Sequence, residues 1–267
     1  MVEQVDPSSA TSGQPQQQQQ VQQPPPIQVQ PAATIEDWKK TTKWKPRLTG
    51  TASGGSPVED VATGDSVGLA KPRDVWQERI AYLLAQLAGV NVAEVRLGRV
   101  EGSQQIHAVS IALGPVSMDV ASLQSQLGPS YNQQQVEAAL RAASGLLAFH
   151  AWLGTGDLKD EHVVADLRGD GTVVVAAIDF ASCCGWQPTD PVSAPGGPGA
   201  LISQVDKAAV QAAVNRIEAT TDEAIGEAVD SLPDAVMPKA DKDRVKKGLC
   251  ARRALVKNCM KNQGWTP

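Results

Sequence analysis

The residues best suited to chemistry lie in residues 157–181, which read DLKDEHVVADLRGDGTVVVAAIDFA. Acidic residues open this stretch, His162 follows them, and Asp179 comes at the end of an apolar run. The Gly-Asp-Gly sequence at 169–171 separates two strand-like runs and predicts a β-hairpin. Because a hairpin brings its two ends together, we expect Asp157, His162 and Asp179 to lie close to one another.

These residue types suit phosphoryl transfer from ATP. That reaction needs a carboxylate to orient the acceptor hydroxyl, ligands to hold Mg²⁺ on the phosphates, and a lysine to neutralise charge. An aspartate that ends so apolar a strand is poorly explained by packing, because burying a carboxylate without partners is costly. We therefore expect the two acidic segments to flank one metal–phosphate site.

The chain before this stretch is predicted to hold strands around a single helix. Residues 38–66 are dense in Gly, Ser and Thr and are expected to form loops, after which the strand VGLAK ends at Lys71. A helix is predicted from Asp74, an N-cap with Gln77 at capping-box spacing, to Gly89. The runs VAEVRLGRV and QIHAVSIALG then predict two further strands.

The second half is predicted to be mostly helical. One long helix is expected at about 132–153, before the hairpin. A loop rich in Gly and Pro at 187–199 follows the hairpin, and acceptor specificity would lie there and in the closing helices. Three helices are expected to close the chain, at 205–219, from Thr220 onward, and at 241–261. This order of elements predicts an α+β fold.

Four motifs, in the right order, resemble the HipA-like protein kinases and the phosphatidylinositol 3-/4-kinases. GTGDLKDEHVVADLRGDGTVVVAAIDFA is similar to their catalytic core, which reads Asp-x-x-x-x-Asn, a hairpin, and Ile-Asp-Phe or Ile-Asp-His. VGLAKPR resembles their nucleotide-binding strand, and ERIAYLLAQLAGVNVAEVRL their helix–turn–strand unit. IGEAVDSLPDAVMPKADKDRVKKGLCARRALV looks like their closing helices. The similarity covers most of Trp44 to Met260 and implies a divergent member.

The resemblance implies a two-lobed, protein-kinase-like fold. A small strand-rich N-lobe with the nucleotide-binding strands and helix would occupy residues 34–115. A helical C-lobe with the catalytic loop and the metal-binding hairpin would occupy residues 116–267. Residues 1–33 are rich in Gln and Pro and lack spaced apolar residues, so we expect a disordered tail there.

The resemblance also implies roles for five residues. Lys71 would contact the α- and β-phosphates of ATP, and Glu78 would pair with Lys71. Asp157 would act as the catalytic base on the acceptor hydroxyl. Asp179 would bind Mg²⁺, or Mn²⁺, with His162 as the second ligand. The implied activity is transfer of the γ-phosphate from ATP to a hydroxyl, with an unidentified protein as the expected substrate.

Some features depart from the family pattern and leave alternatives open. His162 stands where the family usually has Asn, and imidazole suits Mg²⁺ less well than an oxygen donor. A pseudokinase that binds nucleotide or a partner as a scaffold is therefore the alternative.

On a helical wheel Glu78 lies opposite the apolar stripe, so a solvent-facing side chain is equally compatible. The stretch GTASGG at 50–55 is interpreted as a flexible linker or as a phosphate-binding loop. A plain helical binding module would instead leave Lys71 far from Asp179.

Composition and charge exclude several classes of partner. The formal net charge is −5 and no basic stripe carries interleaved aromatic residues, so nucleic acid is not expected. No apolar run approaches the roughly 18 residues that a membrane span requires, and no signal peptide is recognised. The four cysteines lack metal-ligand spacing and suggest reduced thiols in a cytoplasmic protein. His107 and His150 lie in apolar segments and are expected to be core residues.

Overall fold

The computed structural model describes residues 33–44, 55–64, 66–114, 117–123, 133–186, 190–196 and 199–267. The Gln- and Pro-rich tail expected at the N-terminus lies, up to residue 32, outside the described residues. The stretch GTASGG also lies outside them, except for its last glycine.

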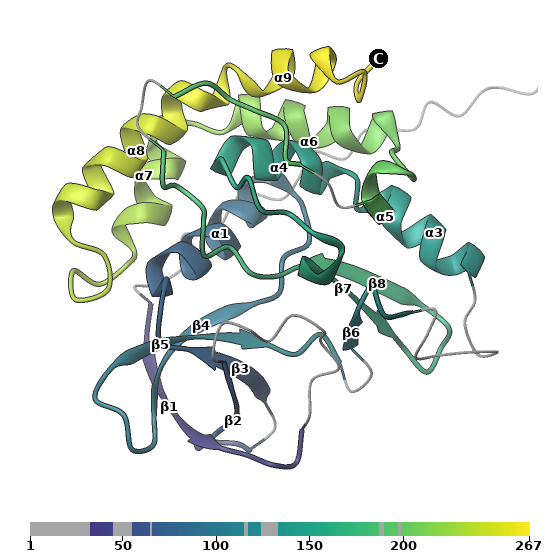
Figure 1. Ribbon diagram of the computed structural model, residues 1–267. Helices are drawn as coiled ribbons and strands as arrows, with labels where there is room; N and C mark the ends of the chain where they lie inside the picture. The colour runs from purple at the N-terminus through teal and green to yellow at the C-terminus, as the bar shows by residue number, and fades with distance from the viewer. Residues whose placement is uncertain are drawn as a thin grey trace, which may run out of the picture.

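Five strands close into a small barrel, which forms the lower part of the molecule in Figure 1. The strands follow one another around the barrel in the order β1, β2, β3, β5, β4, and only β1 and β4 pair in parallel. Their bounds are β1 Ile35–Lys40, β2 Ser56–Asp60, β3 Val67–Lys71, β4 Val95–Val100 and β5 Ile106–Ile111. The predicted strands β3, β4 and β5 are therefore confirmed.

The expectation of loops over residues 38–66 is wrong for β1 and β2. In β1 only Trp38 is buried, so the strand lacks the alternating apolar pattern by which strands are recognised. The Trp38 ring covers Gly98 of β4, where a Cβ atom would come within 2.2 Å of it. One large side chain and a facing glycine thus fill the barrel near β1.

Helix α1 (Val75–Ala88) lies between the barrel and the helical part of the molecule (Figure 1). It contacts β4 and β5 on one side and the helices of the C-terminal part on the other. The predicted helix and its end at Gly89, which has a left-handed φ of 64°, are confirmed. The capping box is wrong, because Asp74 is itself left-handed and its side chain caps no backbone N–H.

The C-terminal part is built mainly from helices, as expected, but two of the predicted helices are broken. The bounds are α3 Gln133–Ala142, α4 Gly145–Leu153, α5 Gly199–Ile202, α6 Lys207–Ala219, α7 Asp222–Asp230, α8 Lys239–Arg253 and α9 Val256–Asn262. Gly145, the first residue of α4, packs closely on α6, where an added Cβ atom would come within 3.0 Å of the Ala213 Cβ atom. Helix α7 begins one residue later than predicted, with Thr221 accepting from the Ala224 N–H.

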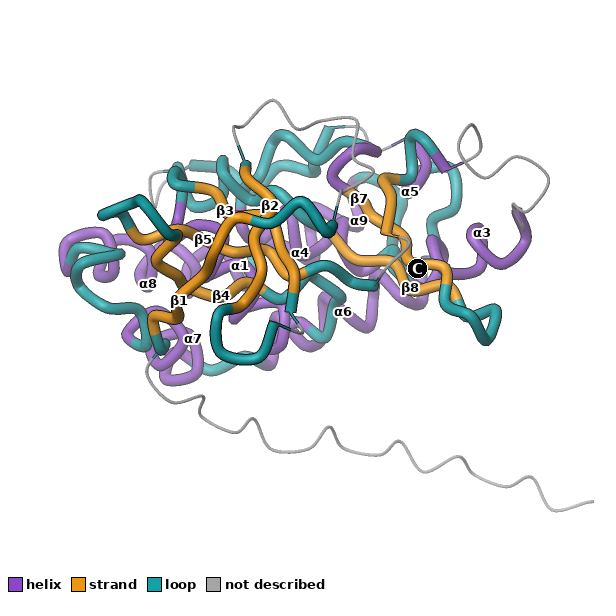
Figure 2. The backbone as a smooth tube through the Cα atoms, turned by 90° about the horizontal axis from the view of Figure 1, so that it is seen from below, coloured by secondary structure: helices purple, strands orange, loops and turns teal. Residues whose placement is uncertain are grey.

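A three-stranded antiparallel sheet lies beside the barrel, as the view from below shows (Figure 2). Its strands are β6 Ser117–Asp119, β7 Val163–Leu167 and β8 Val173–Ala177, with β7 in the middle. The pair β7–β8 confirms the predicted hairpin. Ala177 exchanges backbone hydrogen bonds with Asn91 and Ala93, so the segment after α1 is joined to the strand that leads to Asp179.

Arg252 of α8 fixes the end of α4, from which the chain runs into residues 154–162. Its guanidinium is buried, donates to the carbonyls of Ala151 and Trp152 at 2.9 Å each, and stacks on the ring of Trp186. The last carbonyls of a helix have no partners within the helix, so a cation there satisfies them and complements the helix dipole. The closing helices thereby hold the segment that carries Asp157 in place.

Candidate functional site

Three charged side chains, from the end of β3, from α1 and from the segment after β8, meet between the barrel and the β7–β8 hairpin. Lys71 Nζ, at the end of β3, lies 2.9 Å from Glu78 Oε1 on α1 and 3.2 Å from Asp179 Oδ1. The backbone N–H of Phe180 donates to Glu78 Oε2 at 3.2 Å. The helical-module alternative required Lys71 and Asp179 to be far apart, and this contact removes it.

Glu78 does not face solvent, so that interpretation of the helical wheel is wrong. Its side chain is 1% exposed. The wheel assumes that a helix buries one face, whereas α1 is enclosed on a second side by the segment after β8, where Cys183 Sγ lies 3.4 Å from the Gln77 carbonyl oxygen. Burial raises the pKa of Glu78 above its ordinary value, and the ammonium group of Lys71 opposes that rise and stabilises the carboxylate.

Lys71 is held in its charged form by these neighbours. Burial alone would lower the pKa of Lys71, but the carboxylates of Glu78 and Asp179 outweigh it and raise that pKa above its ordinary value. A fixed ammonium group of this kind can bind an anionic ligand such as a phosphate.

The backbone at Asp179 aims its carboxylate into this cluster. Asp179 has a left-handed φ of 63°, a conformation that costs energy for a residue other than glycine and is found preferentially at functional sites. The preceding residue, Ile178, donates its N–H to the His162 carbonyl at 2.8 Å, so the turn occurs just where the two segments meet. The Asp179 side chain is 19% exposed and is therefore accessible to a ligand.

His162 lies on the side of Asp179 away from Lys71. Asp157 contacts this group only through its backbone carbonyl, which lies beside the His162 ring. His162 Nε2 is 4.0 Å from Asp179 Oδ2, and His162 Nδ1 is 2.7 Å from the carbonyl oxygen of Asp157. The Asp157 carboxylate is 55% exposed and pairs with Lys159 at 2.9 Å. Lys71, Glu78, Asp179 and His162 thus form one cluster. The carboxylate of Asp157, the fifth predicted residue, does not contact this cluster directly.

An apolar slot leads away from Lys71 between the barrel and the hairpin sheet. Apart from Lys71, it is lined by Trp44, Leu69, Ala93, Ser110, Ile111, Ala112, Leu113, Val164 and Ile178. Ile178 precedes Asp179 directly, so the slot and the charged cluster adjoin. The slot has a volume of about 40 Å³, so a flat ring joined to a phosphate chain could enter it only after the barrel and the hairpin sheet move apart. The sequence pattern did not identify the slot, because its lining comes from six separate segments with no shared motif.

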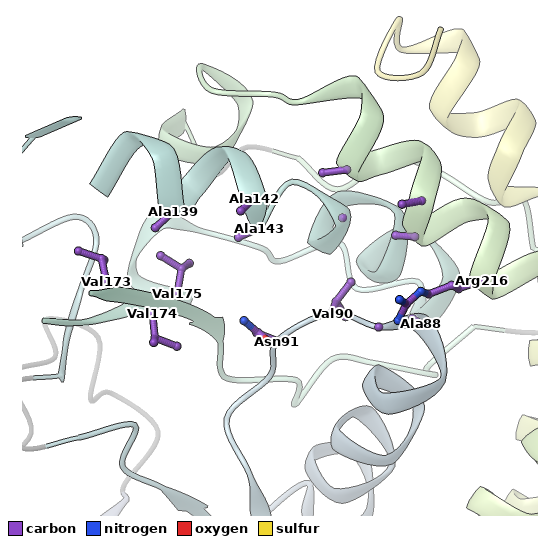
Figure 3. A pocket seen from close by; sticks show the side chains of 15 residues that line it. Ala88, Val90, Asn91, Ala139, Ala142, Ala143, Val173, Val174, Val175 and Arg216 are labelled. Atoms are coloured by element: carbon purple, nitrogen blue, oxygen red, sulfur yellow. The ribbon is translucent and has the colours of Figure 1, made fainter. Parts of the chain in front are cut away.

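A larger cavity of about 410 Å³ lies on a different face, between the end of α1, α3, β8 and α6 (Figure 3). Its walls are mainly alanine and valine side chains, with Arg216 at one end and Asn91 at its floor (Figure 3). It contains no acidic side chain and none of the five predicted residues. The metal–phosphate chemistry expected from the sequence therefore has no place there.

The prediction that His107 and His150 are core residues is confirmed. Both are buried, and the ring of His150 stacks on that of Phe180, the residue after Asp179, at a centroid distance of 4.9 Å. Burial, with a smaller contribution from nearby His162, lowers the pKa of His150 to about 3.

Acidification is expected to destabilise the fold through His150. In the unfolded chain this imidazole binds a proton once the pH falls below its ordinary pKa of roughly 6.5. In the folded chain it does so only when the pH falls to about 3. Stability is therefore lost as the pH falls, by about 2 kcal/mol between about pH 7 and pH 5. Urea unfolding at both pH values measures this loss. His150→Gln, which keeps a polar partner for Thr155, should lose less, and an equal loss in both proteins would contradict the assignment.

No cluster of three or more His, Cys, Asp or Glu side chains able to hold a metal occurs among the described residues. Asp179 and His162 together supply two donors. Two protein donors are enough for an ion that takes its remaining ligands from phosphates and water.

None of the helices in the described part of the chain combines the length and apolar character that a membrane crossing requires.

Comparison with known proteins shows the fold. No family model and no curated protein matches this chain. Among solved structures, it is similar to the proinflammatory kinase CtkA of Helicobacter pylori, with a TM-score of 0.54 and 14% identity over 78% of this chain and 93% of that one. A structure of HipA with HipB and operator DNA from Shewanella oneidensis has a TM-score of 0.47 and 14% identity, over 81% of this chain and 68% of that one. The α+β, kinase-like fold that the motifs implied is thus confirmed.

Proposed function

We propose that this chain is an ATP-dependent phosphotransferase that transfers the γ-phosphate to a hydroxyl group on a protein. The observation that carries the proposal is the meeting of Lys71, Glu78 and Asp179 beside an apolar slot. Each of these side chains comes from a different element, and packing alone gives no reason to bury a lysine with two carboxylates. The kinase fold supports the same function.

In this proposal each side chain has a separate task. Lys71 binds the α- and β-phosphates, and Glu78 holds Lys71 in position for them. Asp179 and His162 hold a divalent cation, Mg²⁺ or Mn²⁺, which when bound neutralises charge on the phosphates. The residues fit such an ion, because a carboxylate oxygen and an imidazole nitrogen face each other in a partly exposed place. Asp157 accepts the proton of the acceptor hydroxyl.

We propose a protein acceptor because the sequence motifs resemble those of the HipA-like protein kinases. A cytoplasmic location belongs to the same proposal. All four cysteines are free, which suits a reducing compartment.

A nucleotide-binding scaffold without transfer activity is the second candidate. One observation favours it: His162 stands where the kinases that the motifs resemble usually have an oxygen ligand. The two candidates agree on nucleotide binding and differ only in turnover.

Calorimetric titration of the full chain with ATP, with and without Mg²⁺ or Mn²⁺, tests the proposal. We expect metal-dependent binding that Lys71→Met weakens about 10- to 100-fold, because a charge-assisted contact contributes roughly 1.5–3 kcal/mol. Lys257→Met, on the outer helix α9, is the matched control and should bind as the wild type does. Transfer of labelled γ-phosphate to casein then separates a kinase from a scaffold. A folded wild type that binds no ATP with either metal would overturn both candidates.

A further inference from the structure

We propose that His162 gives the metal site a preference for Mn²⁺ over Mg²⁺, which an oxygen ligand at this position would not give. This inference rests on the proposed function, because it concerns the cation held with the nucleotide. The tautomer of His162 determines which of its ring nitrogens can bind a metal. The Asp157 carbonyl oxygen can only accept a hydrogen bond, so Nδ1 of His162, 2.7 Å away, carries the hydrogen and donates it. In the neutral ring Nε2 then has a free lone pair.

That lone pair faces the carboxylate of Asp179 without bonding to it. The distance from Nε2 to Asp179 Oδ2 is 4.0 Å, whereas hydrogen bonds involving nitrogen and oxygen measure roughly 2.7–3.2 Å. Two bonds of roughly 2.1 Å, typical of divalent ions with these donors, span up to roughly 4.2 Å. At 4.0 Å the two bonds would open to an angle of about 145°, so an octahedral ion, whose neighbouring donors lie roughly 3.0 Å apart, contacts both atoms once the two side chains close by about 1 Å. A backbone carbonyl that orients the far nitrogen of the ring is also the usual support of a metal-binding histidine.

The side chains around the pair are arranged for this ion as well. Asp179 Oδ1 is occupied by Lys71, which leaves Oδ2 free on the side of His162. His162 is 12% exposed, so its ring is held in a fixed orientation while its edge can be reached by a ligand. The Ile178 N–H donates to the His162 carbonyl, which ties the two ligands together through the backbone.

The donor set decides which ion fits best. Mg²⁺ binds oxygen almost exclusively and gives up its water reluctantly, so an imidazole replaces one of its preferred ligands poorly. Mn²⁺ accepts carboxylate, phosphate and water oxygens as Mg²⁺ does, and although it is the weakest nitrogen binder of the first-row divalent ions, it accepts an imidazole ligand more readily than Mg²⁺ does. With one nitrogen, one carboxylate and the remaining ligands from phosphate and water, the site is suited to Mn²⁺.

The test compares the wild type with His162→Asn, which restores an oxygen donor at the same place in the chain. Dissociation constants for a non-hydrolysable ATP analogue are measured by calorimetry with each metal. We expect the preference for Mn²⁺ over Mg²⁺ to be about tenfold larger in the wild type than in the variant. Comparing the two ratios cancels the different affinities of the metals for the nucleotide itself.

Pulsed electron paramagnetic resonance of the Mn²⁺–analogue complex supplies a readout that does not depend on activity. A nitrogen coupling that changes when the protein is labelled with ¹⁵N-histidine, and that His162→Asn removes, is the expected result. This spectrum needs only wild-type protein if the variant does not fold. Nucleotide binding with both metals but no histidine coupling and no difference in preference would overturn the inference and leave the proposed function standing. Absence of nucleotide binding with either metal would overturn both.

Discussion

Replacing Asp179 with asparagine is expected to abolish metal-dependent ATP binding. The substitution keeps the size of the side chain but removes the charge that lies between Lys71 and His162. It therefore removes an anionic ligand of the cation and one of the two carboxylate partners of Lys71. We expect a loss of affinity of about 100-fold or more in calorimetric titrations with ATP and either Mg²⁺ or Mn²⁺.

Asp170→Asn is the matched control for this experiment. Asp170 lies in the turn of the same hairpin, where its side chain accepts from the backbone N–H of Thr172, and asparagine can accept the same bond. It should bind metal and ATP as the wild type does. Thermal unfolding followed by circular dichroism verifies that both variants are folded. If Asp179→Asn bound metal–ATP as tightly as the control, the cluster would not be the nucleotide site.

The sequence predicted the parts of the site that local patterns determine. The hairpin followed from a Gly-Asp-Gly turn between apolar runs, and its closure brings His162 and Asp179 together, as expected. The strand ending at Lys71 was equally clear. No local pattern, however, placed Lys71 near Asp179. That expectation came only from the order of motifs shared with a kinase family.

The sequence failed where long-range packing determines the structure. Glu78 lies off the apolar stripe of its helix, and only the approach of the segment after β8 buries it. The strained backbone of Asp179 has no signature in residue type, since aspartate also occurs with ordinary φ values. The break between α3 and α4 did have a local signal that the prediction of one long helix missed, because Ser144-Gly145 is a dipeptide typical of turns.

Replacing Asp157 with asparagine is expected to separate catalysis from binding. A positioned general base contributes roughly 10²- to 10⁴-fold to rate, so transfer of labelled γ-phosphate should fall by about that factor. ATP affinity should stay the same, because the Asp157 carboxylate does not contact Lys71, Glu78 or Asp179 directly. The backbone carbonyl that orients His162 is also kept. The ion pair with Lys159 does not argue against this role, because pairs as exposed as this one contribute only about 0–1 kcal/mol and are easily broken.

Glu161→Gln is the matched control, since Glu161 is a nearby acidic residue in the same segment and has no assigned role. Turnover of acceptor and ATP affinity are measured on the wild type and both variants. A selective loss of turnover in Asp157→Asn identifies the base and establishes a kinase. Equal turnover in all three proteins would remove Asp157 from the chemistry. A wild type that binds ATP but transfers no phosphate would favour the scaffold, because the geometry around Lys71 and Asp179 supports binding whether or not Asp157 acts as a base.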